Sequence, residues 1–387
     1  MMLETKHDQS MVRKHHMLLL FKLIKRFGPI SRAELAKMTE MSATSTSRIV
    51  KELIDQHFIV EVGQTEGGVG RRAILLEVNP KGGLLLGVTI ELDSIEVGIV
   101  DLNGSVLIKQ KQEIDASDSP FDILDMIADL LNKMKNEYID FKDRFMGCGV
   151  SIPGIVDWPS GKVVMIPQFH WSNIELRDYL EKKIGMSVFV DNQVKAILLG
   201  EILYGSAVGM ESAACIYVGS GLGGAFMDKG DVVRGINNIA GEIGHTTIDP
   251  NGILCDCGRI GCLQTYICSS ALEKESGKSI NEIFAAKHNN ERWAINLLDR
   301  ASEYLAMTIS NVACTYNPEV IVLAGPMIER DSDWVGSIKK KLSLFLWSEV
   351  VQEVNIHYQS EGSAGIIGAS CLVLKEFLES PIGLVQQ

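Results

Sequence analysis

Four residues with metal-binding side chains lie close together in the sequence: His245, Cys255, Cys257 and Cys262. Thiolate and imidazole groups are preferred ligands of tetrahedral Zn²⁺, and a Cys₃His set with short spacings is typical of a closed structural site. Gly258 and Gly261 let the backbone curl so that the last cysteine can return toward the metal. The pattern therefore predicts a zinc site, with a regulatory disulfide and plain buried cysteines as the alternatives.

The rest of the sequence favours reduced thiols. Residues 1–16, MMLETKHDQSMVRKHH, lack the apolar core of a signal peptide, and no apolar run reaches the length of a membrane-spanning helix. We therefore expect a cytoplasmic protein with no membrane partner, which disfavours a disulfide. The other cysteines lie in apolar runs and are expected in the core: Cys148, Cys215, Cys268, Cys314 and Cys371.

The charge is unevenly distributed along the chain. A chain of 387 residues exceeds what one hydrophobic core usually organises, so two or three domains are expected. The formal net charge is −12, yet residues 1–80, here called the head, contain 12 basic residues against 9 acidic ones. The head therefore carries +3 and the remaining body −15. This asymmetry indicates that only the head approaches a polyanion.

The head has the pattern of a winged helix-turn-helix domain. Apolar side chains recur at helical spacing over residues 13–27, and a Gly-Pro pair ends that run. A second helix begins at Ser31, which has capping-box spacing to Glu34, and it continues to about Met38. A third helix is expected over residues 42–58, and its first turns carry small polar side chains.

The third helix suits DNA recognition. Short hydroxylated side chains would let its N-terminal end enter a major groove, while basic side chains further along reach phosphates or base edges. The residues expected to contact DNA here are Ser42, Thr44, Ser45, Thr46, Arg48 and Lys51. The alternative is an ordinary amphipathic helix with an exposed end rich in serine and threonine.

A wing is expected after the third helix. Two strand-like runs over residues 59–78 are joined by a glycine-rich turn that ends in Arg71 and Arg72. Two basic side chains at the tip of a hairpin can contact phosphates or the minor groove. The head is therefore predicted to bind double-stranded DNA, with a protein-binding winged helix as the alternative.

The body alternates glycine-punctuated strands with helices. GLLLGVTI, SIEVGIVD and FMGCGVSI are strand-like, and a second cycle of strands and helices begins at AACIYVGSGLGGAF. Such alternation indicates an α/β fold, and two cycles indicate two lobes with a ligand-binding cleft between them. We expect residues 81–196 plus 365–387 in the first lobe. Residues 197–364, with the metal site and most of the pocket, are expected in the second.

Six motifs are distributed over nearly the whole chain. They are GGVGRRA at 67–73, SIPGIVD at 151–157, VDNQVKAILLGE at 190–201, VGSGLGGAF at 218–226, AGEIGH at 240–245 and CDCGRIGCLQ at 255–264. Together they resemble the ROK family (repressors, open reading frames and kinases), within its xylose-repressor-like branch. The resemblance implies a two-lobed actin/hexokinase-like sugar-kinase fold behind the head, and it implies the same four zinc ligands.

The resemblance also implies a pocket for a small sugar or polyol. Glu242 would accept hydrogen bonds from hydroxyl groups, Asn192 would offer a bidentate amide, and Gly154 would let the backbone approach the sugar. His245 would belong to both the metal set and the pocket. Gln264 stands where the kinases of the family usually have glutamate. The alternative is that Glu242 or Asn192 is merely a surface or turn residue.

The sequence departs from the kinase pattern of the family at two places. The aspartate that would act as general base falls on Gln193, whose amide cannot accept a proton at neutral pH, and strand alternation points Asp191 elsewhere. The Asp-x-Gly-Gly-Thr phosphate turn falls on residues 89–93, where Glu91 adds repulsion. The glycine loop at 219–224 can persist as structure. We therefore expect no enzymatic activity; the alternatives are a ROK-type sugar kinase with residual ATP-dependent phosphorylation and a pure scaffold.

The predicted function is that of a cytoplasmic, sugar-responsive transcriptional repressor. One head offers too little contact for a long operator, so a two-fold homodimer, or a tetramer of such dimers, is expected. If sugar closes the cleft and holds the heads at the wrong spacing, operator affinity falls by linkage.

Overall fold

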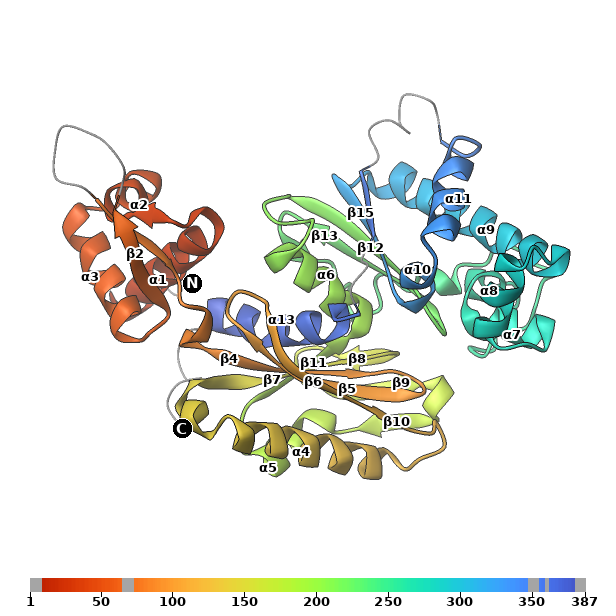
Figure 1. The fold of residues 1–387 in the computed structure, drawn as a ribbon, viewed down its shortest axis with the longest axis horizontal. Helices are drawn as coiled ribbons and strands as arrows, with labels where there is room; N and C mark the ends of the chain where they lie inside the picture. The colour runs from red at the N-terminus through yellow and green to blue at the C-terminus, as the bar shows by residue number, and fades with distance from the viewer. Residues whose placement is uncertain (1–8, 65–72, 347–354, 359–361, 380–387) are drawn as a thin grey trace, which may run out of the picture.

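The computed structural model describes residues 9–64, 73–346, 355–358 and 362–379. A small head is followed by a body of two α/β lobes, each built on its own five-stranded sheet (Figure 1). This architecture confirms the predicted fold class. Among the helices of the described ranges, none has both the length and the apolar character needed to cross a membrane.

The head consists of three helices and a three-stranded antiparallel sheet with the order β1-β3-β2. Its elements are α1 (Gln9–Phe27), β1 (Ile30–Ser31), α2 (Arg32–Thr39), α3 (Ala43–Asp55), β2 (Ile59–Gln64) and β3 (Ile74–Val78). The predicted capping box is present, because the Ser31 hydroxyl accepts from the Glu34 amide and the Glu34 carboxylate accepts from the Ser31 amide. α3 ends earlier than predicted, since His57 has a left-handed backbone (φ 65°).

The first lobe contains a sheet with the order β11-β7-β4-β5-β6, in which β4, β7 and β11 are parallel. Helices α4 and α5 cover one face and α13 covers the other, which explains why β4 is buried throughout and apolar except for Thr89 (Figure 1). A small antiparallel sheet, β10-β9-β8, completes the lobe. The elements are η1 (Pro80–Gly82), β4 (Leu84–Ile90), β5 (Ser94–Asp101), β6 (Val106–Glu113), α4 (Pro120–Glu137), η2 (Ile139–Arg144), β7 (Phe145–Ile152), β8 (Ile155–Asp157), β9 (Lys162–Ile166), η3 (Pro167–Phe169), β10 (Trp171–Ile174), α5 (Leu176–Ile184), β11 (Val188–Asn192) and α13 (Ala364–Glu379).

The second lobe is built on a sheet with the order β14-β13-β12-β15-β16. Its elements are β12 (Ser212–Val218), β13 (Leu222–Asp228), β14 (Asp231–Val232), α7 (Ser269–Ser276), α8 (Ile280–His288), α9 (Arg292–Tyr316), β15 (Val320–Ala324), α10 (Pro326–Arg330), α11 (Ser332–Leu342) and β16 (Ile356–Tyr358). Gly277, with φ of 67°, ends α7 and separates it from α8. Cys314 is exposed on the outer face of α9, contrary to prediction, whereas the other four cysteines expected in the core are buried.

Two helices connect the lobes. α6 (Gln193–Tyr204) follows β11 and packs against α13 as well as against β12 and β13 of the second sheet. The two helices approach so closely that a Cβ on Gly368 would lie 2.5 Å from the carbonyl oxygen of Ala196. The boundary expected between residues 196 and 197 falls inside α6, so this helix belongs to both lobes.

The head packs against the C-terminal part of α13. The rings of Phe21 in α1, Phe58 before β2 and Phe377 in α13 meet, with centroids between 4.8 and 6.3 Å apart. Buried apolar side chains of the head and of the first lobe form one continuous core at this joint. Because α13 also packs on α6, a movement between the lobes can reach the head through one helix.

Gly149→Ala should strongly destabilise the body. A Cβ at this position of β7 would lie 1.8 Å from the carbonyl oxygen of Ala369 in α13, so the sheet and the helix would have to separate. Overpacking of a core typically costs about 1–3 kcal/mol, and a backbone clash leaves little room for relief.

Gly336→Ala in α11 is the matched control, because no atom lies within 4 Å of the added Cβ and alanine favours a helix by roughly 0.5–1 kcal/mol over glycine. Thermal unfolding should give a lower melting temperature for Gly149→Ala and an equal or higher one for Gly336→Ala. If Gly149→Ala melts at the same temperature as the wild type, the close contact between β7 and α13 is refuted.

Candidate functional site

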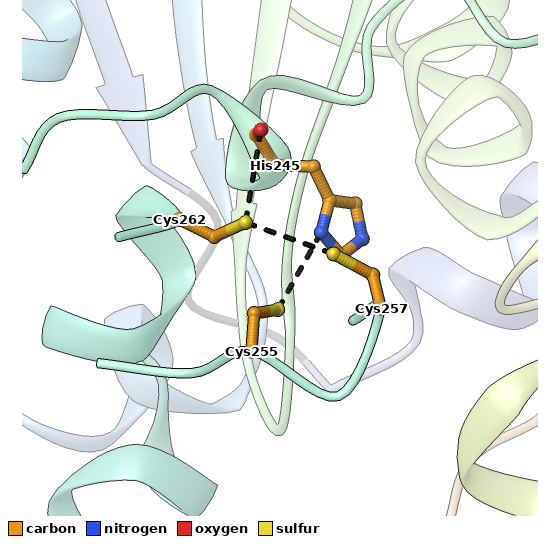
Figure 2. Close-up of side chains that lie close together, drawn as sticks. All are labelled: His245, Cys255, Cys257 and Cys262. Carbon is orange, nitrogen blue, oxygen red and sulfur yellow. Dashed lines mark hydrogen bonds between the residues drawn. The ribbon is translucent and has the colours of Figure 1, made fainter. Parts of the chain in front are cut away.

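Four ligand side chains converge on one point in the second lobe (Figure 2). His245 ends the 3₁₀ helix η4 (Ile243–His245), Cys255 and Cys257 lie in the following loop, and Cys262 precedes η5 (Leu263–Tyr266). Their ligand atoms all lie within 4.8 Å of one another. The distance is 3.7 Å from Sγ of Cys257 to Sγ of Cys262, and 3.7 Å from Sγ of Cys255 to Nδ1 of His245. Ligands about 2.3 Å from a tetrahedral metal would lie roughly 3.8 Å apart, so the set fits a closed tetrahedral site.

The loop that carries these ligands depends on two glycines. Gly258 and Gly261 have φ angles of 83° and 71°, which is the curl expected from the sequence. A Cβ on Gly261 would lie 1.6 Å from the carbonyl oxygen of Asp249. The amide of Cys255 donates to the carbonyl of Arg259 at 2.8 Å, and the amide of Gly258 donates back to the carbonyl of Cys255 at 2.9 Å. Backbone hydrogen bonds of the loop therefore hold the ligand side chains toward one another.

A cavity of about 250 Å³ lies between the lobes beside this cluster. Its wall contains the residues that the sequence predicted to bind ligand: Gly154, Asn192, Glu242, His245 and Gln264. Glu91 and Asp256 add two further carboxyl groups. No lysine or arginine lines the cavity within the part of the chain that the structure describes.

Asn192 shapes the wall of the cavity rather than presenting a free amide. Its Oδ1 caps α6 by accepting from the amides of Val194 at 3.0 Å and Lys195 at 3.4 Å, and its Nδ2 donates to the carbonyl of Gly154 at 3.0 Å. Gly154 has φ of 84°, and a Cβ there would lie 2.4 Å from the carbonyl oxygen of Met165. These contacts hold the turn after β7 against the start of α6.

Gln264 and His245 connect the metal-ligand cluster to the cavity. Nε2 of Gln264 lies 3.3 Å from Sγ of Cys255 and donates to it, while the residue also lines the cavity. The Nδ1 atom of His245 faces Cys255, so Nε2 is the ring nitrogen left for a ligand. Burial lowers the pKa of His245, with a smaller contribution from Arg259, which favours the neutral imidazole that metals require.

Glu242 is the acceptor best placed for a ligand hydroxyl. Burial raises the pKa of Glu242, and the ammonium of Lys195 partly offsets that rise. Lys195 is itself buried, and its Nζ donates to the carbonyl of Asn238 at 3.0 Å. Over the described ranges, no protein group donates a hydrogen bond to the Glu242 carboxylate, so both of its oxygens can accept from a ligand.

A group of side chains that the sequence did not predict bridges the lobes at the cavity. Glu91 follows β4 of the first lobe, and its carboxylate accepts hydrogen bonds from the hydroxyl of Tyr217 in β12 at 3.1 Å and from the amide of Gln193 at the start of α6. Burial raises the pKa of Glu91 to about 7, although these two hydrogen bonds limit the rise. Glu91 was expected only to repel phosphate, and nothing in the sequence pairs it with a tyrosine 126 residues away.

Asp191 belongs to a second polar network between the lobes. Its carboxylate accepts from Nη1 of Arg234 at 2.7 Å and from Nδ2 of Asn238 at 3.1 Å. The Arg234 guanidinium also lies 3.9 Å from the ring centroid of Trp158. Asp191 is buried and paired in this way and does not line the cavity, so it is not placed to act as a base there.

Most of the residues expected to contact DNA lie on the accessible side of α3. Ser42 caps the helix, since its hydroxyl accepts from the amide of Ser45 at 3.1 Å. Thr44, Arg48 and Lys51 are exposed, and Ser45 is partly exposed. Within the described residues, this face of the head is therefore accessible to another molecule.

Thr46 differs from its neighbours on α3. It is fully buried together with Val50, one turn further along, so its side chain faces the core of the head and cannot contact DNA as predicted. Arg71 and Arg72, the residues expected in the wing, lie outside the described residues.

Glu91→Gln should make the free energy of unfolding less sensitive to rising pH. The pKa of this carboxyl is raised from 4.5 to about 7 in the folded chain, so the folded state keeps a proton that the unfolded state loses between these values. Wild-type stability therefore falls as pH rises through this window, by on the order of 1–3 kcal/mol. Glutamine keeps an acceptor for Tyr217 but cannot ionise.

Melting temperatures measured from pH 5 to pH 8 should fall less in Glu91→Gln than in the wild type. Glu137→Gln, an exposed position at the end of α4, should follow the wild-type profile. If the melting temperatures of Glu91→Gln and the wild type fall equally with pH, Glu91 is not a buried carboxyl with a raised pKa.

Comparison with known proteins places these features in a family. The model of the ROK family matches residues 85–376. The chain is 29% identical over 378 residues to the xylose repressor of Bacillus spizizenii, covering 96% of this chain and 98% of that protein. It is 27% identical over 341 residues to the N-acetylglucosamine repressor of Shigella flexneri, covering 83% of each protein.

Solved structures have the same fold. A ROK family transcriptional regulator, described as a homolog of the E. coli MLC protein, has a TM-score of 0.82 at 26% identity and covers 97% of this chain and 100% of its own. The body alone is similar to a ROK family glucokinase from Streptomyces griseus, with a TM-score of 0.68 at 24% identity over 76% of this chain and 100% of that one. Because the family model matches most of the sequence, this chain belongs to the ROK family.

Proposed function

We propose that this chain is a sugar-responsive transcriptional repressor that binds operator DNA with its head and a small sugar or polyol in its body. The observation that carries the proposal is that one chain joins a helix-turn-helix head, through α13, to a cavity with a free carboxylate acceptor. The names of its relatives, the xylose repressor and the N-acetylglucosamine repressor, support this function.

DNA binding is assigned to the exposed face of α3. Thr44 and Ser45 would read base edges near the N-terminal end of the helix, while Arg48 and Lys51 would contact phosphates or bases further along. Arg71 and Arg72 would extend these contacts from the wing. The net charge of +3 on the head against −15 on the body favours this orientation toward a polyanion.

The effector is assigned to the cavity between the lobes. Glu242 would accept hydrogen bonds from sugar hydroxyls, Nε2 of His245 would donate one, and the turn at Gly154 would approach the sugar through its backbone. The amide of Gln264 would contact the sugar beside the thiols that bind the metal. Since carboxyl groups line the cavity and none of its described lining residues is lysine or arginine, it favours a neutral polyol, and xylose is the first candidate from the names of the relatives.

The metal that we propose for the Cys₃His set is Zn²⁺ in a structural role. Two distances between its sulfur and nitrogen atoms, both 3.7 Å, match a tetrahedral ion, and all four ligands would come from the protein. Bound zinc would hold the loop after η4 in one conformation. The orientation of the His245 ring toward the sugar would then depend on the metal.

The chain is not expected to act as a kinase. Gln193 cannot serve as a general base, and its amide is engaged by the Glu91 carboxylate. The carboxyl groups at the cavity would repel a nucleotide triphosphate, and no described cation lines its wall to offset them. The alternative, a ROK-type kinase with residual activity, rests on the likeness of the body to a glucokinase.

We propose that the repressor acts as a homodimer or a tetramer of dimers. Two heads related by a two-fold axis can read a near-palindromic operator that one head cannot hold alone. Sugar binding would change the angle between the lobes, and α13 would transmit the change to the head through Phe377. The free energy of operator binding then changes by at most the difference in sugar-binding free energy between the two lobe arrangements.

The metal assignment predicts about one zinc per chain by elemental analysis of the purified protein. Cys257→Ser should lower the zinc content and the melting temperature together and weaken the response to sugar, because metal binding is linked to folding of the loop. Cys314→Ser, which changes an exposed cysteine on α9, is the matched control and should keep the metal. Loss of zinc with unchanged sugar affinity would show that the metal does not shape the cavity.

The function itself is tested by a thermal-stability screen against xylose, other pentoses, hexoses, amino sugars and inositols. The sugar that stabilises the protein should change operator affinity in a gel-shift assay. Glu242→Ala should abolish that change while operator affinity without sugar stays within about twofold, since only the head contacts DNA. Glu137→Ala is the matched control, because its carboxylate is exposed and distant from the cavity.

The same sugar separates a sensor from a kinase. With ATP and this sugar, a coupled assay should detect no ADP release above background, since loss of a general base alone typically costs about 10²–10⁴ in rate. Turnover that Glu242→Ala abolishes would make the chain an enzyme. If the chain neither binds sugar nor turns it over, the scaffold alternative would hold instead.

A further inference from the structure

A second cavity, of about 370 Å³, lies where the head meets the body, away from the sugar cavity. Its walls come from the C-terminal part of α1, from α6 and the turn after it, from β14 and from α13. It therefore touches the head, the second lobe and the helix that connects them. We call it the joint cavity.

The joint cavity is strongly basic in a chain whose net charge is −12. Three cations come from α1 and one from α13, against a single acidic residue: they are Lys22, Lys25, Arg26 and Lys375, with Asp231. Asp231 is mostly exposed, and one of its oxygens lies 3.9 Å from Nζ of Lys375, beyond hydrogen-bond distance. Asp231 thus offsets one positive charge by its ion pair with Lys375, and the excess positive charge of the lining belongs to the three cations of α1.

Two of the α1 cations, Lys25 and Arg26, contact the body. Lys25 is largely buried, with its Nζ donating to the carbonyl of Leu102 at 3.1 Å and lying 3.7 Å from the centroid of the Tyr204 ring. Burial lowers the pKa of Lys25 to about 8. Arg26 crosses from the head to the body, because a Cβ on Gly209 would lie 2.5 Å from its Nη2 atom. In the described chain neither Lys22 nor Arg26 forms an ion pair.

Cations at the end of a helix have a simpler explanation, since they offset the negative end of its dipole. Lys25 and Arg26 do lie in the last turn of α1. That explanation does not cover Lys22, which lies a turn earlier, or Lys375, which belongs to another helix. It also does not account for a cavity large enough for a small molecule between these side chains.

We infer that the joint cavity binds a small molecule that carries a phosphate group. A phosphate monoester carries a charge of about −1.5 to −2 at neutral pH, which would offset most of the excess positive charge. The guanidinium of Arg26 offers paired donors that suit phosphate, and the lysines supply point charges. The remaining wall includes apolar side chains of α6, among them Ile202 and Leu203, against which an organic group can pack.

A ligand at this position would act on the head directly. It would hold α1 against the turn at Gly209 and against β14, and so fix the head relative to the second lobe. The sugar cavity lies between the lobes and would act through α13 instead. A phosphorylated metabolite and a neutral sugar would thus be sensed at separate sites, each shifting the population of head positions.

The test measures binding to the full chain by calorimetry, without DNA or sugar, at constant ionic strength. The probes are inorganic phosphate, glycerol 3-phosphate and glycerol. The two phosphates should bind saturably and glycerol should not. Tighter binding of glycerol 3-phosphate assigns the site to an organic phosphate, whereas equal binding of both assigns it to the phosphate group alone.

The variant is Lys22→Gln combined with Arg26→Gln, because neither side chain is buried and Lys25 keeps its structural hydrogen bond. It should weaken phosphate binding at least tenfold and leave the melting temperature without ligand within about 2 °C. Lys133→Gln combined with Lys142→Gln removes the same charge from the exposed surface of the first lobe and should bind phosphate like the wild type.

Three outcomes would overturn the inference. One is the absence of saturable phosphate binding to the wild type. Another is equal binding by the wild type and the Lys22/Arg26 double variant, which would place the phosphate elsewhere. The third combines two results: the wild type does not bind phosphate, and the double variant loses affinity for random DNA with a shallower salt dependence. The joint cavity would then be a contact for the DNA backbone.

Discussion

The backbone contact of α13 with β7 and α6 is the constraint on which the rest of the arrangement depends. A Cβ on Gly149 would lie 1.8 Å from the carbonyl oxygen of Ala369, and one on Gly368 would lie 2.5 Å from that of Ala196. Interfaces packed this closely do not deform continuously, so the lobes can move only by changing how whole elements meet. Because the other end of α13 carries Phe377 into the core of the head, the same helix that joins the lobes also positions the head.

Two polar networks make the angle between the lobes specific. Glu91 joins β4 to Tyr217 of the second sheet, and Asp191 joins β11 to Arg234. Buried hydrogen bonds and ion pairs contribute modestly to net stability but are costly to leave unpaired, so they favour one lobe arrangement over its neighbours. Of the two carboxylates only Glu91 lines the cavity between the lobes, so a ligand there can disturb one network while the other keeps the lobes together.

Local features were predictable from the sequence because they depend on residues close together in the chain. The capping box at Ser31, the left-handed glycines of the metal loop and the convergence of the three cysteines with His245 are of this kind. Features that need tertiary contacts were not predictable. They include the pairing of Glu91 with Tyr217, the capping role that occupies the amide of Asn192, the thiol contact of Gln264 and the burial of Thr46 on a helix with little polar contrast in its first turn. The placement of the predicted pocket residues around one cavity followed from the family resemblance rather than from spacing.

The residues on which we base the proposal of a non-enzymatic chain also suit the cavity to the proposed role of a sensor. A kinase must admit a phosphate donor and keep a base free, which requires an open, cationic turn and an unpaired carboxylate. Here the carboxylate stands at the turn itself, and its hydrogen bonds to Tyr217 and Gln193 join the elements that a donor would separate. A sensor needs only that its ligand distinguish two lobe arrangements, since an equilibrium can shift by no more than the difference in affinity. In the proposed sensor, hydrogen bonds that cross the cleft would supply such a difference, because a sugar would bind well only to the lobe arrangement in which these bonds and its own contacts are satisfied together.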